Sequence, residues 1–292
     1  MFNPLEYHLC LEKPRRVTDI LSWHEHIPFA FALIQMLRPK IFVELGTHKG
    51  DSYFAFCQAV DVLKLGTACY AVDTWKGDEH AGLYEEKVLA ELKAYHESHY
   101  KAFSTLIRCS FDVALSHFAD KSIDLLHIDG LHSYDAVKHD YDNWLPKMSE
   151  QGIVLLHDIS VRERDFGVWR LWEELSSKYE TVEFKYGHGL GIIPVGSTIP
   201  KPLKDLSLAM KENNGHISDF FYILGFRLSL LDTLALERKQ LETKDNLISE
   251  LNAQNAEHER KMHDLLHSWS WRMTAPLRSF FCFLTDKKTP HS

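Results

Sequence analysis

Two short apolar runs, residues 123–128 and 153–156, lie at the centre of the chain and are separated by a polar segment of helical length. Continuous apolar runs of this length are typical of buried strands in a parallel sheet. The first run ends at Asp129 and the second at His157 and Asp158. Because the carboxyl ends of neighbouring parallel strands face one crevice, where ligands bind, we expect these side chains to share one site.

The same alternation of strand, turn and helix extends to about residue 195. The further expected strands are residues 40–45, 68–72, 104–109, 181–186 and 190–195, and the further expected helices are residues 23–37, 51–63, 113–118 and 168–179. The last two strands are joined through Gly187, His188 and Gly189, a tight connection that predicts a hairpin. The predicted fold class is therefore α/β: a Rossmann-like, doubly wound, seven-stranded and mostly parallel sheet with an antiparallel edge hairpin.

The pattern changes after residue 202, and residues 230–265 contain no glycine or proline. One heptad position holds Leu234, Leu241, Ile248, Asn255 and Met262, and the other holds Leu230, Glu237, Lys244, Leu251, His258 and Leu265. This half-polar seam predicts a coiled coil, in which Asn255 favours a parallel dimer in fixed register. The alternative is one long solvated helix that folds back on the domain.

Five parts are therefore expected. They are an N-terminal helical segment (residues 1–38), the α/β domain (39–199), a connector (200–229), the coiled coil (230–265) and an aromatic, basic tail (266–292). The tail interleaves aromatic side chains with cations, which suits a membrane interface or a partner groove, and it is too short to span a bilayer.

Composition limits the possible functions. The chain of 292 residues is long enough for one large domain and an appendage, and its net charge of −8 argues against nucleic acid as a partner. Five scattered cysteines without a CxxC pair indicate a reducing compartment. The N-terminus lacks the pattern of a secretory signal, so we expect a cytoplasmic protein, with peripheral contact at the inner membrane through the tail.

The first strand ends in a glycine turn, FVELGTHKG at residues 42–50. Gly46 and Gly50 would allow a ligand to approach the backbone closely, and Glu44 supplies a carboxylate. Because this is not GxGxxG, a nicotinamide dehydrogenase is disfavoured. Asp73 ends the next strand and is positioned to accept hydrogen bonds from ribose hydroxyls. The alternatives are a helix-capping role for Glu44 and an ordinary turn role for Asp73.

At these motifs the chain resembles a known family. The segments VELGTHKG and AVDTW resemble the first two motifs of class I S-adenosylmethionine-dependent methyltransferases. The segments IDLLHIDGLHSY, GIVLLHDI, DTWKGDEHAGLY and DFGVWRLWEEL are similar to a subgroup linked to bacterial surface-polysaccharide and sugar O-methylation. That subgroup is distantly related to metal-dependent catechol and macrolide-sugar O-methyltransferases. The resemblance covers about residues 30–196.

The resemblance implies S-adenosylmethionine as the cofactor. The residues at matching positions are Glu44, Gly46, Thr47, Gly50, Asp73, Ser110, Phe111 and Asp129. Glu44 and Gly46 would line the methionine and ribose part, and Asp73 would hold the ribose diol. Ser110 and Phe111 would lie beside the adenine.

The resemblance also implies catalytic and metal-binding roles. Asp129 and Asp158 take the positions of metal-ligand carboxylates, which suit Mg²⁺. His157 stands where related enzymes have a carboxylate or an amide, so a set of Asp129, His157 and Asp158 would favour Mn²⁺ or another transition ion, or would bind no metal. His132 matches a catalytic histidine, and its ordinary pKa of about 6.5 would leave it neutral and able to act as a general base beside Asp129.

Substrate contacts are expected from the loops that overhang the crevice. The candidates are Trp75, Asp78, His80 and Tyr134. The alternative is that the first three only close their loop.

The sequence thus predicts an O-methyltransferase for a hydroxyl of a bacterial cell-surface glycan, such as an O-antigen polysaccharide, or its lipid-linked or nucleotide-sugar precursor. A homo-oligomer would form through the coiled coil. A second hypothesis is a non-catalytic scaffold that recruits glycan-assembly enzymes, because the tail segment SWSWRMTAPLR resembles the ends of glycan-assembly proteins.

Overall fold

The computed structural model describes residues 2–78, 82–84, 86–212 and 215–279. Two compact units make up the chain, Met1–Asp232 and Thr233–Ser292. The first unit contains the expected α/β domain together with the segments on either side of it, residues 1–38 and 200–229. His80 and the tail beyond residue 279 lie outside the described residues.

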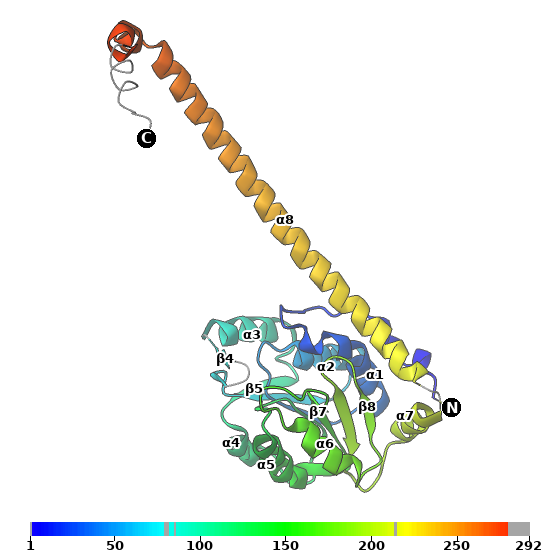
Figure 1. Ribbon diagram of the computed structural model, residues 1–292. Coiled ribbons are helices and arrows are strands. Elements are labelled where there is room, and N and C mark those ends of the chain that lie inside the picture. Colours follow the sequence, from blue (N-terminus) through cyan, green and yellow to red (C-terminus); the bar gives the residue numbers. More distant parts are fainter. Residues whose placement is uncertain (1, 79–81, 85, 213–214, 280–292) are drawn as a thin grey trace, which may run out of the picture. The chain divides into compact units, whose positions relative to one another are not determined.

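A seven-stranded sheet forms the centre of the first unit, in the order β5-β2-β1-β6-β7-β9-β8 (Figure 1). The strands are β1 (Ile41–Leu45), β2 (Ala68–Asp73), β5 (Ser104–Arg108), β6 (Ile123–Ile128), β7 (Met148–His157), β8 (Val182–Phe184) and β9 (Leu190–Pro194). Strands β5, β2, β1, β6 and β7 are parallel, and β9 is antiparallel to both β7 and β8. The expected mostly parallel sheet with an antiparallel pair at one edge is confirmed.

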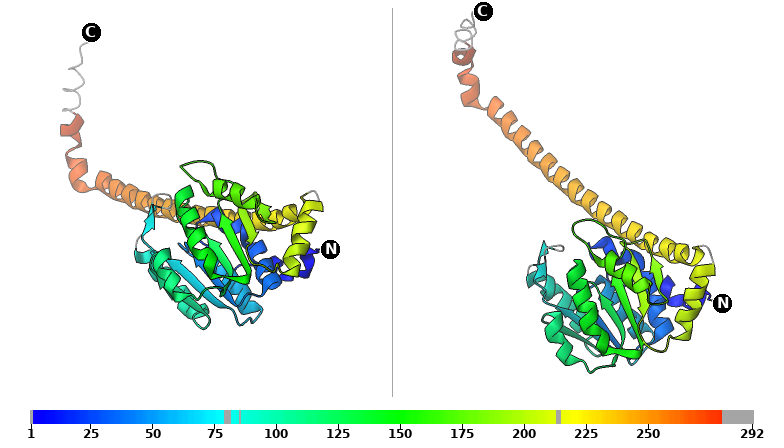
Figure 2. Two further views of the ribbon diagram at one scale, coloured as in Figure 1. Left: turned by 90° about the horizontal axis from the view of Figure 1, so that it is seen from below. Right: turned by 60° about the horizontal axis from the view of Figure 1, so that its bottom comes forward.

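Helices cover both faces of this sheet, as the views in Figures 1 and 2 show. One face carries α1 (Ile27–Leu37), α2 (Asp51–Val62), α3 (Glu86–His99), α7 (Lys201–Glu212) and the first turns of α8 (His216–His267). The other carries α4 (Phe111–Ala114), α5 (Tyr134–Trp144) and α6 (Val168–Ser176). With both faces covered, the central strands are buried on both sides, which explains their nearly continuous apolar sequence.

The N-terminal segment is mostly not α-helical. It forms three short 3₁₀-helices, η1 (Pro4–Glu6), η2 (His8–Leu11) and η3 (Leu21–His26), before α1 begins at Ile27. The expected single helix over residues 23–37 therefore divides between His26 and Ile27, and Pro28 lies in the first turn of α1. Proline is favoured there because the first helical N–H groups have no partner within the helix.

Some elements were not expected from the sequence. Helix α3 is one of them, because only Leu89, Leu92 and His96 of its fourteen residues are buried and its apolar periodicity is weak. The short hairpin of β3 (Gly77–Asp78) and β4 (Gly82–Leu83) is another. Short 3₁₀-helices, η4 (Leu115–His117) and η5 (Leu145–Lys147), extend α4 and α5. The expected connector joins the first unit because Ile217 and Phe221 of α8 are buried in its core.

The second unit contains the rest of α8 and the short α9 (Trp269–Met273). From residue 233 to residue 267 every described side chain is exposed, including the leucines of the heptad seam. Leu241 and Ile248 of the seam are 59% and 55% exposed. One continuous helix is therefore confirmed, whereas its pairing as a coiled coil stays a prediction. Among the described residues no helix is both long and apolar enough to cross a bilayer.

The seam can be tested with charged substitutions. The double variant Leu241→Asp, Ile248→Asp places carboxylates in the heptad position that a parallel dimer buries, so it should convert a dimer to a monomer. Leu236 is similarly exposed, at 53%, but lies outside both seam positions, so Leu236→Asp should leave the mass unchanged. Multi-angle light scattering of the full chain measures the mass. A monomeric parent, or a double variant that remains dimeric, would show that this seam does not associate.

Candidate active site

A cavity of about 460 Å³ opens at the carboxyl ends of β1, β2, β6 and β7. Ten of the residues expected at the site line it: Gly46, Thr47, Gly50, Asp73, Ser110, Phe111, Asp129, His132, His157 and Asp158. Its volume is in the range typical of small-ligand and cofactor sites, about 300–1,000 Å³. The sequence motifs therefore converge on one pocket.

The glycine turn after β1 is fixed by contacts with the protein itself. Gly46 has a φ of 88°, and a Cβ built on it would lie 2.0 Å from the carbonyl oxygen of Asp129. Gly50 has a φ of 85°, and its Cβ would press against the Phe54 ring. Both positions thus need glycine, but the close neighbours are backbone and side chains of this chain, whereas we expected a ligand.

Asp73 holds the glycine turn in place. Its Oδ2 accepts hydrogen bonds from the backbone N–H groups of Thr47 (3.0 Å) and His48 (2.9 Å), and its Oδ1 accepts one from Trp75 (2.6 Å). The carboxylate also lines the cavity. Asp73 therefore ties the end of β2 to the turn after β1 and still faces the pocket.

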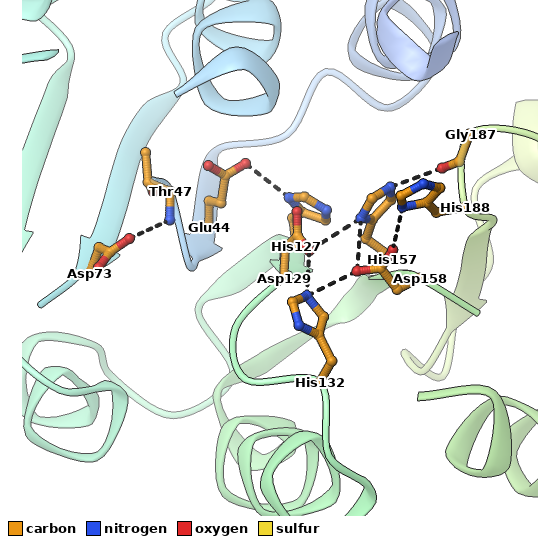
Figure 3. A network of polar contacts seen from close by, with 10 residues as sticks. All are labelled: Glu44, Thr47, Asp73, His127, Asp129, His132, His157, Asp158, Gly187 and His188. Carbon is orange, nitrogen blue, oxygen red and sulfur yellow. Dashed lines mark hydrogen bonds and ion pairs between the residues drawn. The ribbon is translucent and has the colours of Figure 1, made fainter. Parts of the chain in front are cut away.

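Glu44 does not line the cavity. Its Oε2 lies 2.9 Å from Nδ1 of His127, its register partner on β6, and both side chains are fully buried (Figure 3). Burial raises the pKa of Glu44, although His127 acts in the opposite direction. The structure thus places Glu44 in an interior pair rather than at the expected cofactor contact.

A cluster of aspartate and histidine side chains lies where β6 and β7 end (Figure 3). Nε2 of His132 is 2.9 Å from Oδ2 of Asp158 and 3.6 Å from Oδ1 of Asp129. Asp158 has a φ of 63°, in the left-handed region, and His188 lies 3.2 Å from its other carboxylate oxygen. One ligand atom from each of Asp129, His132 and Asp158 lies within 4.8 Å of the others, so the three could hold a metal ion.

His157 is a charged partner of the two carboxylates. Its Nδ1 lies 3.2 Å from Asp129 and 3.5 Å from Asp158, and its Nε2 lies 3.1 Å from the carbonyl oxygen of Gly187. Carboxylates and carbonyls only accept hydrogen bonds, so both ring nitrogens must carry protons. Burial opposes this charge, but Asp158 and Asp129 hold the pKa of His157 well above its ordinary value. Among the described residues, the group whose ligand atoms lie close enough to hold a metal ion does not include His157, so its expected role as a metal ligand stays a prediction.

His132 also differs from expectation. Burial lowers its pKa, but hydrogen bonds to Asp129 and Asp158 outweigh burial and raise the pKa to about 9. The expectation that an ordinary pKa leaves His132 neutral is therefore wrong for the chain without a bound cation. The pKa is raised because the two carboxylates stabilise the protonated, positively charged form of His132.

The residues expected beside adenine lie on the pocket wall. Ser110 is the N-cap of α4 and its Oγ accepts from the N–H of Val113 at 3.5 Å. Phe111 packs against Gly130, where a Cβ would lie 2.5 Å from its ring. Both residues therefore line the cavity, and local contacts hold them in place there.

Of the expected substrate residues, Trp75 and Tyr134 have described side chains, and neither lines the cavity. Trp75 is 2% exposed, and its indole N–H donates to the carbonyl of His48 at 3.0 Å. Tyr134 donates its hydroxyl to Glu174 at 2.6 Å, on α6. The backbone of Asp78 lies in β3, and its side chain is outside the described part of the chain.

Several lining residues were not found from the sequence. They include Ile20, Ser22 and Trp23 from the N-terminal segment, Tyr84 after β4, Arg164 and Phe166 from the loop after β7, and His188 from the hairpin. The loop after β7 carried a usable signal, because loops at the carboxyl ends of parallel strands build the ligand crevice. The N-terminal segment carried none.

Comparison with known proteins points to the same region. Residues 43–159 match the profile of a family described as a methyltransferase domain. A protein of Sinorhizobium fredii (strain NBRC 101917 / NGR234), "Uncharacterized protein y4gI", is 41% identical over 256 residues, which are 87% of this chain and 28% of that protein. The chain thus spans just over a quarter of that relative's length. The expected resemblance is confirmed for the methyltransferase domain, but not for the surface-polysaccharide subgroup.

Solved structures also match. SAH-bound methyltransferase PaMTH1 of Podospora anserina is 13% identical, with a TM-score of 0.45 over 65% of this chain and 93% of that one. A Staphylococcus aureus protein provisionally assigned as a caffeoyl-CoA O-methyltransferase is 18% identical, with a TM-score of 0.46 over 61% of this chain and 84% of that one. Neither identity is high enough to transfer a substrate or a residue role.

A buried acid beside the site predicts a dependence of stability on pH. Asp140 of α5 lies next to Gly130, and burial raises its pKa to about 7, while His139 acts to lower the pKa and Asp112 to raise it. The unfolded chain has an Asp pKa of about 3.9, so the folded state binds this proton more tightly and stability falls as pH rises from about 4 to 7.

Asp140→Asn should therefore gain stability over the parent at pH 8 by up to a few kcal/mol, and less at pH 5. Urea unfolding at both pH values measures this difference. Asp142→Asn, an exposed position paired with Lys138 at 2.9 Å, is the control and should change stability little. An Asp140→Asn effect that is equal at both pH values would contradict the assignment.

Proposed function

We propose that the chain is an S-adenosylmethionine-dependent O-methyltransferase whose acceptor is a sugar hydroxyl of a bacterial cell-surface glycan or of its precursor. The observation that carries this proposal is the convergence of Asp129, His132 and Asp158 at the edge of the cavity that opens beside the glycine turn. The match of residues 43–159 to a methyltransferase domain supports it.

The cofactor would lie between the glycine turn and the start of α4. The backbone there is held by Asp73, and the wall is formed by Thr47, Ser110 and Phe111. When bound, S-adenosylmethionine supplies an electrophilic methyl group on a sulfonium. The role of the chain is to fix the acceptor oxygen in line with that methyl group, and such positioning contributes up to roughly 7–11 kcal/mol to catalysis.

The residues present also fit a divalent cation. Asp129 and Asp158 supply hard carboxylate oxygens, which suit Mg²⁺ or Mn²⁺, and His132 would stay outside the ligand set so that its ring nitrogen is free to take a proton. A cation there would acidify a hydroxyl that it polarises. It would also neutralise the carboxylates that hold the proton on His132.

His132 would then be the proton acceptor. Its ring is stacked on Phe166 with centroids 4.5 Å apart and planes 4° apart, so its orientation is fixed. A neutral imidazole held in this way can take the proton of the attacking hydroxyl, and general-base catalysis of this kind is worth about 10²–10⁴-fold in rate. His157 would keep Asp129 and Asp158 in position throughout, because its two N–H groups are directed at Asp129 and Gly187.

A scaffold remains the second candidate. The exposed apolar side chains of α8 favour an association function for the second unit. The buried charge cluster at the strand ends favours a catalytic first unit, because such a cluster costs stability and is retained where it serves a purpose. The two functions are compatible within one chain.

Cofactor binding and the role of His132 are tested together. S-adenosylhomocysteine titrated into the full chain should bind at micromolar concentration by calorimetry, and His132→Ala should bind it nearly as well. His132→Ala should lose at least about a hundredfold of the methyl transfer from labelled S-adenosylmethionine to a glycan extract of the source cells. His139→Ala, an exposed histidine, is the control. No binding by the parent chain would refute the enzyme hypothesis, and full activity of His132→Ala would remove His132 from catalysis.

Metal binding has a readout that does not depend on activity. Millimolar Mn²⁺ should raise the melting temperature of the EDTA-treated parent, since binding to the folded state stabilises it. The Mn²⁺-induced rise should disappear in Asp158→Asn and persist in Asp112→Asn, whose carboxylate is 61% exposed on α4. If Mn²⁺ and Mg²⁺ leave the melting temperature of the parent unchanged, Asp129 and Asp158 hold no metal.

A further inference from the structure

The loop after β7, residues 159–167, contributes Arg164 and Phe166 to the wall of the cavity and is hydrogen-bonded to the loop that carries His132. The N–H of Gly167 donates to the carbonyl of His132 at 2.7 Å. A Cβ on Gly167 would lie 2.3 Å from the backbone nitrogen of Tyr134, so only glycine fits there. The indole N–H of Trp169 donates to the carbonyl of Phe166 at 2.9 Å. The backbone at Phe166 and Gly167 is therefore held at a fixed place relative to His132, and the exposed Arg164 lies two residues before Phe166.

Arg164 brings a cation to this wall. Its guanidinium lies 5.3 Å from the centroid of the Phe166 ring, and that ring lies 4.5 Å from the ring of His132 on which it stacks. The Phe166 ring thus lies between the guanidinium of Arg164 and the ring of His132, the proposed proton acceptor. Phe166 is only 8% exposed, so packing holds in place the ring over which the guanidinium lies.

Arg164 also differs from the other arginines nearby. Arg162 of the same loop bonds to Glu173 at 3.3 Å and lies over the Trp169 ring, and Arg170 lies over the Tyr134 ring. The structure gives Arg164 no ion pair with any carboxylate of the described residues, and of these three it alone lines the cavity.

The acids of the cavity are already matched with other groups. Asp129 and Asp158 face His157 and His132. Asp73 accepts three backbone N–H groups, as described above, and Asp51 bonds to the backbone and hydroxyl of Thr18. The pocket's lysine, Lys49, bonds to Asp19. Arg164 therefore lines the cavity without a carboxylate partner among the described residues, so an anionic ligand would supply the matching negative charge.

We propose that Arg164 recognises an anionic group on the acceptor, a carboxylate or a phosphate carried by the sugar that is methylated or by its neighbour. This inference rests on the proposed function and adds the charge of its substrate. The planar guanidinium matches both anions by paired hydrogen bonds. The acceptor would thus be an acidic glycan unit or a sugar phosphate, such as a nucleotide sugar, rather than a neutral sugar.

The test uses the full chain saturated with S-adenosylhomocysteine. Four probes are titrated by calorimetry: methyl glucuronide, glucose 1-phosphate, uridine diphosphate and the neutral methyl glucoside. The parent should bind at least one anionic probe about tenfold or more tightly than the glucoside. Comparison of the glucuronide with the two phosphates identifies which anion is recognised.

Variants then assign the effect to one side chain. Arg164→Ala should lose about tenfold or more in affinity for the preferred anion, Arg164→Lys should retain part of it, and the matched control Arg162→Ala should bind as the parent does. Affinity for S-adenosylhomocysteine should be equal in all four proteins. Failure of every anionic probe, equal binding of the glucoside, or unchanged binding by Arg164→Ala would each overturn the proposal. If the parent does not bind S-adenosylhomocysteine, the proposed function fails separately, and the anions are titrated into the chain alone.

Discussion

Two aspartates at neighbouring strand ends determine how this site is built. The topology of a parallel sheet brings the ends of β6 and β7 together, and Asp129, which is partly exposed, and Asp158, which is buried, therefore lie close to each other at the wall of the cavity. Two like charges there would repel and would be poorly solvated. Burial alone would raise both pKa values, but His157, supported by His132, holds both of them low. The imidazolium of His157 in turn needs the carbonyl of Gly187, so the edge hairpin is part of the same arrangement.

Much of the fold could be predicted from the sequence, because each central strand is a short apolar run ending in a polar residue. The boundaries of β6 were predicted correctly at both ends, and the hairpin through Gly187 and Gly189 is present. Helix α3 was not predicted, because only three of its residues are buried and its apolar pattern is therefore weak. The role of the N-terminal segment could not be predicted either, because 3₁₀ geometry leaves no periodic apolar pattern and its contacts with the pocket are made across long separations in sequence.

At the site, residue types were predicted better than residue roles. The sequence gives the order of Asp129, His132, His157 and Asp158, but the charge on a histidine depends on which atoms face it in space. His157 illustrates this point, because only the positions of Asp129 and Gly187 show that both of its nitrogens donate. Glu44 is similar: alternation along β1 does not tell whether a strand-end carboxylate turns to the crevice or to the neighbouring strand. Arg164 lies in a loop whose conformation no pattern specifies.

The backbone at Asp158 has an evolutionary consequence. This residue has a left-handed φ of 63° and also supplies a buried negative charge. Asparagine and glycine tolerate that conformation but bring no charge, while glutamate brings the charge but pays the steric penalty of a longer side chain in a disfavoured conformation. None of these substitutions keeps both the left-handed backbone conformation and the negative charge. Sequence drift at this position should therefore be far slower than at His188, whose side chain is 53% exposed and whose contact is peripheral.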